Sequence, residues 1–335
     1  MVPFRPVRAL MALSLLVAAC QIVETQCDKE CQDDAWLDSG LSPDSCGFDS
    51  NKTCLVSRRV PALSDSEKAA LPVVVAVHGY TASTYEWEEF RNYAEDTGKA
   101  HAKVRVSLVL LGGHGLSLDA FLSSSWKSWG VPILSEYDSL AKQGYKNISF
   151  ACASAGCALL MQYISDGAFK ARQAPKHIFM IDPFVVPASK ALSLVDLVGP
   201  VLGNAPDQGN SIEVKHWYTS RPQETLQELY ELANLVKNRL EDGFKLPKGT
   251  LAKVYKSKQD KFAAPVGALL IYKGMRQSDG SHIEVEMVDS HLHDFTRLQG
   301  RNLTGNPSPQ QRALQLAVFD EMIARILPQK PGPLP

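Results

Sequence analysis

A serine in a turn of small residues is the first side chain whose surroundings suggest covalent chemistry. Ser154 stands in the segment Cys152 to Gly156, between a short apolar run and a stretch with helical periodicity. On such a strand-to-helix turn a serine is held in a strained conformation, with its hydroxyl exposed and a helix N-terminus beneath a developing oxyanion. We interpret Ser154 as a nucleophile, although a serine before a helix is more often only its N-cap. A base and an acid elsewhere in the chain must decide between the two.

Two histidines near the C-terminus could supply the base. His291 and His293 follow a strand that we predict over residues 283–288. A neutral imidazole can accept the serine proton and later return it. A His-x-His pair could instead bind a metal ion, but no obvious third ligand cluster accompanies it in the sequence. We therefore expect no metal and no organic cofactor, and both histidines are candidate bases.

Two aspartates could supply the acid that orients the base. Asp260 follows a strand predicted over residues 251–256, and Asp182 follows a strand predicted over residues 178–181. A carboxylate in this role holds the imidazole in one orientation and stabilises its cationic form. In triads built on a strand-to-helix turn, the chain order is serine, aspartate, histidine, with the acid on a late loop. This order favours Asp260, and Asp182 is the alternative.

Two backbone N–H groups are candidates for an oxyanion hole. One belongs to Tyr80, in the segment Val77 to Thr81 immediately after the first clear strand. The other belongs to Ala155, directly after the proposed nucleophile. Donors of this kind stabilise the charge of a tetrahedral intermediate in acyl transfer. A plain strand-to-loop turn, for which Gly79 alone would suffice, is the simpler interpretation of the first segment.

The elements that must position these residues alternate along the chain. Short β-branched runs separated by helical stretches begin at Leu71, which is typical of a parallel sheet covered by crossover helices. The predicted strands are 73–77, 104–110, 148–151, 178–181, 251–256 and 283–288, and the predicted helices are 84–96, 155–165, 264–276 and 309–327.

Residues from about 188 to 247 interrupt this alternation. They contain an apolar stretch, a polar loop and the amphipathic run Glu224 to Leu240. We interpret them as a helical cap inserted between two late strands of a single domain that covers residues 71–335. A leucine-rich cap would line an apolar pocket, which suggests an acyl chain of short to medium length.

The N-terminus has the features of an export signal. Residues 1–19 carry Arg5 and Arg8 followed by an apolar run that is too short to span a bilayer. The run ends in a lipobox-like sequence at Cys20, which predicts export and lipid attachment of Cys20 in a bacterial cell envelope. Simple secretion, and an apolar N-terminus that is retained, are the alternatives.

The cysteine content agrees with an oxidising compartment. The chain has seven cysteines, so setting Cys20 aside leaves six that could pair. Residues 20–70 form a polar, cysteine-rich arm without sustained periodicity, which we interpret as looped. Two disulfides within the arm are favoured over a zinc site, and the pairing is open. The arm cysteines are Cys27, Cys31, Cys46 and Cys54.

Composition excludes some partners. The formal net charge is −1 and 45% of the residues are hydrophobic. Such a chain can bury a large core, but it has no basic field that would attract nucleic acid by releasing counterions. We expect a small-molecule acyl ester or a lipid as its partner and no nucleic acid.

Several of these segments together resemble the esterase and monoacylglycerol-lipase branch of the α/β-hydrolases, from about Val73 to Leu327. Cys152 and Cys157 depart from the usual pattern around the nucleophile, and the arm has no counterpart. The matching segments are 78–83, 113–115, Trp126 and Trp129, the turn at Ser154, the cap residues 218–222 with the leucines that follow, Gln259-Asp260 with Pro265, and 293–296.

The resemblance implies a fold and an activity. The fold would be a mostly parallel sheet flanked by helices, with a helical cap. The activity would be ester hydrolysis through an acyl-enzyme, with Ser154, His293 and Asp260 as the triad and Tyr80 and Ala155 as the oxyanion donors. The match at residues 293–296 selects His293 over His291. An acyltransferase or thioesterase on the same fold, and a non-catalytic envelope binding protein, are the alternatives.

Overall fold

The computed structural model describes residues 63–96, 104–188, 213–218, 221–301 and 307–327. The predicted export signal, Cys20 and the cysteines of the arm lie outside these residues. At the C-terminal end of the arm, Asp65–Ala70 form a short helix, α3. Ser64 caps it by accepting a hydrogen bond from the N–H of Glu67, so the arm ends in regular structure rather than in a loop.

A parallel sheet of six strands forms the centre of the described chain. Every predicted strand is confirmed, with ends that shift by a residue or two. The order β2-β1-β3-β4-β6-β8 places the strands that precede Ser154, Asp182 and Asp260 side by side. The strands are β1 (Pro72–Val77), β2 (Arg105–Val109), β3 (Asn147–Ala153), β4 (His177–Ile181), β6 (Leu251–Ser257) and β8 (Glu284–Val288).

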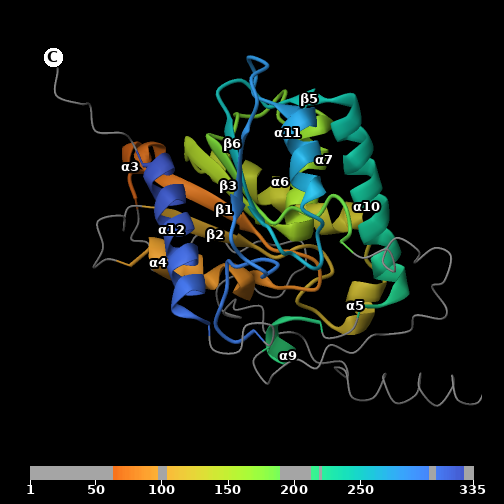
Figure 1. The fold of residues 1–335 in the computed structure, drawn as a ribbon. Helices are drawn as coiled ribbons and strands as arrows, with labels where there is room; N and C mark the ends of the chain where they lie inside the picture. Colours follow the sequence, from red (N-terminus) through yellow and green to blue (C-terminus); the bar gives the residue numbers. More distant parts are fainter. Residues whose placement is uncertain (1–62, 97–103, 189–212, 219–220, 302–306, 328–335) are drawn as a thin grey trace, which may run out of the picture.

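Helices cover both faces of the sheet, and side chains that alternate along each strand contribute to one apolar cluster on each face. In β1, Val73 and Val75 join one cluster while Val74 and Ala76 join the other. Figure 1 shows α4 and α12 on one side of the sheet and α6, α7, α10 and α11 on the other. The helices are α4 (Glu88–Ala94), α6 (Trp126–Lys142), α7 (Ser154–Ser165), α10 (Gln223–Asp242), α11 (Val266–Gly274) and α12 (Pro309–Ile326).

Several helical segments differ from the prediction. The predicted helix 84–96 is divided into a 3₁₀ turn, η1 (Thr84–Trp87), and α4. The predicted helix 264–276 is shorter, because its last two residues form β7 (Met275–Arg276), which pairs with β5 (Phe244–Lys245). Helices α5 (Leu118–Leu122) and α6 were not predicted; α6 contains Pro132, which usually interrupts a helix.

Helix α6 forms in spite of this proline because its apolar face is buried. Trp129, Ile133, Tyr137 and Leu140 recur at helical spacing and are buried in the same apolar cluster as α7. At its start, the hydroxyl of Ser125 accepts a hydrogen bond from the N–H of Ser128. Tertiary packing and this cap therefore outweigh the low helix propensity of the proline.

Helix α10 lies within the predicted cap insertion but contributes to the core. It packs against α7 and α11, and Leu229, Leu232 and Leu240 belong to the same apolar cluster as α7. These leucines therefore belong to the core, and the expectation that cap leucines line a pocket for an acyl chain stays a prediction. Residues 189–212 and 219–220 of the predicted insertion lie outside the described chain.

The start of α7 comes very close to the loop that follows β1. A Cβ built on Gly156 would lie 2.5 Å from the carbonyl oxygen of His78, which is backbone and cannot rotate away. Only a glycine allows the helix carrying Ser154 to approach this loop so closely. By contrast, a Cβ on Gly267, near the start of α11, would meet Val185 at an ordinary 3.5 Å.

We therefore expect Gly156→Ala to destabilise the protein by about 1–3 kcal/mol, because the added methyl group forces the two backbones apart. The free energy of unfolding from urea denaturation measures this effect. Gly267→Ala is the matched control, and it should leave the stability equal or slightly higher because alanine favours the helix. Equal stability of the two variants would contradict the close approach seen at Gly156.

Candidate active site

Ser154 occupies a strained turn between β3 and α7. Its φ angle is +46°, a left-handed conformation that is uncommon for residues other than glycine. The N-cap of α7 is Ala153, and Ser154 is the first residue of the helix. The interpretation of Ser154 as an ordinary helix cap is therefore wrong. Such strain persists only where the surrounding structure enforces it, and it is frequent at functional sites.

The hydroxyl of Ser154 stands at the end of a chain of hydrogen bonds. Its Oγ lies 2.8 Å from Nε2 of His293, and Nδ1 of the same imidazole lies 2.7 Å from Oδ2 of Asp260. The three residues come from the turn after β3, the loop after β6 and the loop after β8. The structure thus brings together the serine, histidine and aspartate that the sequence singled out, in the order that a catalytic triad requires.

Both carboxylate oxygens of Asp260 accept two hydrogen bonds each. Its Oδ1 accepts hydrogen bonds from the N–H groups of Phe262 and Ala263, at 2.8 and 3.1 Å. Its Oδ2 accepts from His293 and also from the ammonium of Lys256. Burial alone would raise the pKa of Asp260, but His293 and then Lys256 outweigh it and lower the pKa to about 2. The carboxyl group is therefore ionised at neutral pH.

The pKa of His293 is shifted in the opposite direction to that of Asp260. Burial alone would lower its pKa, but the charge of Asp260 and its hydrogen bond, together with the charges of Asp294 and Asp182, raise the pKa above its ordinary value. The imidazolium that forms when a base accepts a proton is therefore stabilised at this position.

The two rival residues lie elsewhere. His291 is exposed, and its neighbour His293 makes the contacts with Ser154 and Asp260. Asp182 is buried, with a φ angle of +44°, and its Oδ1 accepts hydrogen bonds from Lys256 and from the N–H of Ser257. Its Oδ2 accepts from the N–H of Asp294 at 3.1 Å. Asp182 therefore supports the histidine loop through its backbone and is not the partner of the imidazole.

His78 fixes the peptide that follows Gly79. Its Nε2 accepts a hydrogen bond from the N–H of Leu111 at 3.1 Å, so Nδ1 carries the proton and donates to the carbonyl of Gly79 at 2.8 Å. Burial lowers the pKa of His78 to about 4, which keeps the ring neutral. Because a trans peptide holds its C=O and N–H antiparallel, the N–H of Tyr80 must point away from His78.

The peptide that follows Ser154 is fixed in a similar way. The carbonyl of Ser154 accepts a hydrogen bond from the N–H of Phe184 at 3.1 Å, so the N–H of Ala155 points in the opposite direction. First-turn N–H groups of a helix have no partner within the helix. A Cβ built on Gly79 would lie 3.1 Å from Cβ of Ser154, which places the loop bearing Tyr80 directly beside the serine.

A pair of buried carboxyl groups next to the site escaped the sequence analysis. Glu86 and Asp294 face each other, and Oε1 of Glu86 accepts a hydrogen bond from the N–H of Gly79 at 2.8 Å. Burial and the mutual repulsion of the pair raise the pKa of Asp294. Glu86 lies in a run of polar residues and Asp294 beside the histidine, so neither stood out from its neighbours in the sequence.

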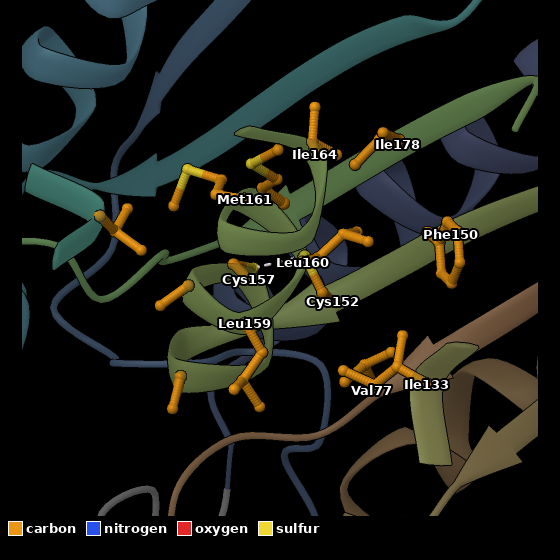
Figure 2. Packing of buried hydrophobic residues seen from close by; sticks show 14 of the residues in the cluster. Val77, Ile133, Phe150, Cys152, Cys157, Leu159, Leu160, Met161, Ile164 and Ile178 are labelled. Atoms are coloured by element: carbon orange, nitrogen blue, oxygen red, sulfur yellow. Dashed lines mark hydrogen bonds between the residues drawn. The ribbon is translucent and has the colours of Figure 1, made fainter. Parts of the chain in front are cut away.

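The two cysteines around the turn face the core. Figure 2 shows Cys152 and Cys157 side by side among apolar residues of β3 and α7, with their sulfur atoms 2.6 Å apart. Both are free and buried. The side chain at the first position of the turn thus lies in the apolar cluster that α7 covers.

Within the described ranges, no group of three or more His, Cys, Asp or Glu side chains could hold a metal ion. None of the helices in this part of the chain combines the length and the apolar character needed to cross a bilayer.

Comparison with solved structures identifies the fold. No protein-family model matches the chain, and no curated protein matches its sequence. A structure from work on the metagenome-derived lipolytic enzymes LipS and LipT is similar over 77% of this chain and 94% of its own, with 19% identity and a TM-score of 0.58.

Two monoacylglycerol lipases are also similar. That of Paleococcus ferrophilus shares 12% identity, with a TM-score of 0.54, over 76% of this chain and 94% of its own. A soluble variant of the Saccharomyces cerevisiae enzyme shares 9% identity, with a TM-score of 0.53, over 79% of this chain and 88% of its own. At such low identities the likeness concerns the fold, and the chain has the α/β-hydrolase fold.

Proposed function

We propose that the protein is a serine hydrolase of carboxylic esters, with Ser154 as nucleophile, His293 as general base and Asp260 as the orienting acid. The observation that carries the proposal is the continuous hydrogen-bond chain from Ser154 through His293 to Asp260, with lengths of 2.8 and 2.7 Å. It begins at a serine in a strained left-handed conformation. The likeness to lipolytic enzymes and monoacylglycerol lipases supports the same class.

The first half of the reaction forms an acyl-enzyme. Nδ1–H of His293 donates to Asp260, which leaves Nε2 free to accept the proton of the Ser154 hydroxyl. The serine oxygen attacks the ester carbonyl, and the N–H groups of Tyr80 and Ala155 stabilise the resulting oxyanion. The imidazolium then gives its proton to the leaving alcohol as the C–O bond breaks.

The second half releases the acid. His293 accepts a proton from a water molecule, whose oxygen attacks the acyl carbon, and returns that proton to Ser154 as the acyl–oxygen bond breaks. Every step needs Asp260 ionised and His293 able to alternate between its neutral and charged forms. The opposite directions of their pKa shifts favour this arrangement.

We also propose a small acyl ester or a lipid as substrate. The ring of Tyr80 packs near Phe121 and Trp129, at centroid distances of 5.6 and 5.9 Å, so the residue carrying an oxyanion donor has apolar neighbours. Export and lipid attachment at Cys20 are further proposals, which rest on the sequence of the N-terminal segment.

Ser154→Ala should reduce the hydrolysis of p-nitrophenyl butyrate by at least about 10³-fold, because it removes the nucleophile. Labelling by a fluorophosphonate probe should disappear in the same variant. Ser165→Ala, at the other end of α7, is the control and should retain both reactions. Full activity of Ser154→Ala would exclude the mechanism, and a wild-type protein that reacts with no fluorophosphonate would favour a binding protein on this fold.

Asp260→Asn should lower kcat by about 10³–10⁴-fold, because the amide favours the wrong tautomer of His293. Asp182→Asn should cost less than about tenfold at the alkaline plateau, since Asp182 touches the histidine loop only through the backbone of Asp294. Steady-state kinetics on the two variants compare the acids directly. A larger loss in the Asp182 variant would reverse their roles.

Activity should fall as the pH decreases through the pKa of His293, because only the neutral imidazole accepts the serine proton. Since that pKa is raised, the acid limb of kcat/KM should have its midpoint above pH 6.5. The pH profile of kcat/KM between pH 5 and 9 measures it. A midpoint near pH 4 would indicate that a carboxyl group, and not His293, controls the reaction.

A further inference from the structure

A lysine ammonium is buried directly behind the triad. Lys256, on β6, has no solvent exposure and lies between the carboxyl groups of Asp182 and Asp260. Its Nζ is 2.8 Å from Oδ1 of Asp182 and also donates to Oδ2 of Asp260. This second oxygen is the one that accepts the hydrogen bond of His293. Lys256 and His293 therefore share one oxygen of the triad acid.

Burying the charge of Lys256 costs free energy that packing alone does not explain. Removing an ammonium group from water costs several kcal/mol, and an apolar residue of similar size would fill the same space in the sheet. The two preceding residues of the strand, Val254 and Tyr255, are equally buried and carry no charge. The cost is offset here by two carboxylates, one of which belongs to the triad.

We propose that Lys256 is a positioning residue that shares Asp260 Oδ2 with His293 and so limits how tightly the Asp260–His293 pair holds a proton. The inference rests on the proposed function, because the pair matters only if His293 is the base. With Lys256 in place, part of the negative charge of Asp260 is neutralised, and the cation disfavours a second positive charge on His293. The base therefore releases its proton at a lower pH than Asp260 alone would allow.

The charges around His293 determine whether Lys256 favours or disfavours its protonation. Asp260 and Asp182 are negative groups that favour the imidazolium. Asp294 acts in the same direction when it is ionised, but burial and Glu86, which faces it from η1, raise its pKa. Among the groups in direct contact with the triad acid, Lys256 supplies the opposing charge. The charged groups that face His293 or its immediate neighbours are Glu86, Asp182, Lys256, Asp260, Asp294 and Arg301.

Asp182 serves as the second anchor of this lysine. Besides Lys256, it accepts hydrogen bonds from the N–H and the hydroxyl of Ser257 and from the N–H of Asp294. Lys256 and Asp182 thus connect the acid loop after β6 with the histidine loop after β8. Without Asp182 the ammonium would interact with Asp260 alone, and its effect on the pair would increase.

Lys256→Met tests the proposal, because methionine has a similar length and no charge. We expect the acid limb of kcat/KM to move to higher pH by about one unit or more, since the two carboxylates lose their cation and hold the proton more tightly. Asp182→Asn should move the same limb to lower pH, because it removes an anion and keeps Lys256. Asparagine also tolerates the left-handed conformation of position 182.

Ser257→Ala is the matched control. It removes the buried hydrogen bond of 2.9 Å from the Ser257 hydroxyl to Asp182 but changes no charge. If Lys256 served packing alone, Lys256→Met and Ser257→Ala would both lower activity at all pH values, and neither would move the acid limb of kcat/KM. We expect the limb of Ser257→Ala to stay within about 0.3 unit of wild type, well below a charge effect.

Titration of His293 by NMR provides a readout that does not need activity. Its pKa should be higher in Lys256→Met and lower in Asp182→Asn than in wild type. If Lys256→Met folds and the pKa of His293 is unchanged in it, the proposal is overturned. If Lys256→Met does not fold, a pKa of His293 in Asp182→Asn that is not lowered overturns the proposal. A wild type without esterase activity would refute the proposed function, and the titration would still decide whether Lys256 controls the proton affinity of His293.

Discussion

The whole site depends on one backbone constraint, the left-handed turn that takes the chain from β3 into α7 at Ser154. A non-glycine residue at this φ angle costs about 1–3 kcal/mol, so its surroundings must hold it there. Two contacts do so. Gly156 lets the helix start lie against the carbonyl of His78, and Phe184 donates its N–H to the carbonyl of Ser154. The Phe184 contact also orients the peptide of Ala155, and the hydrogen bond from His78 to the carbonyl of Gly79 orients that of Tyr80, the two peptides whose N–H groups we assign to the oxyanion hole.

The carboxyl edge of the sheet also concentrates charge. Parallel strands end at the same edge, so the loops after β4, β6 and β8 bring Asp182, Asp260 and Asp294 close to one imidazole. Unpaired carboxylates buried so near each other would repel strongly. Lys256 contacts two of them and supplies the compensating positive charge, whereas the third, Asp294, faces Glu86, another carboxyl group, and has a raised pKa. The edge therefore combines carboxylates that stabilise an imidazolium with a buried lysine that neutralises part of their charge.

The strands were predicted because their signal is local, and the proposed triad residues were found just after such strands, with the family resemblance selecting His293 over His291. Short β-branched runs mark buried parallel strands, and Ser154, Asp260 and His293 each follow such a run. Signals that depend on tertiary packing were missed. Pro132 concealed helix α6, whose buried face holds it together. Nothing in the sequence singled out Lys256, the last residue of a predicted strand, and only its two partners, from different loops, show why it is buried.

Cys152 was the departure that spoke for a non-catalytic protein, since this position of the turn is usually glycine. Successive residues of β3 face opposite sides of the sheet, so Ala151 and Ala153 join one apolar cluster while Cys152 joins the other. Its sulfur lies beside that of Cys157 and within reach of the carbonyl of Phe179, in the apolar cluster that α7 covers. The close approach that needs a glycine occurs at Gly156 instead. A cysteine at position 152 is therefore compatible with an intact nucleophile turn.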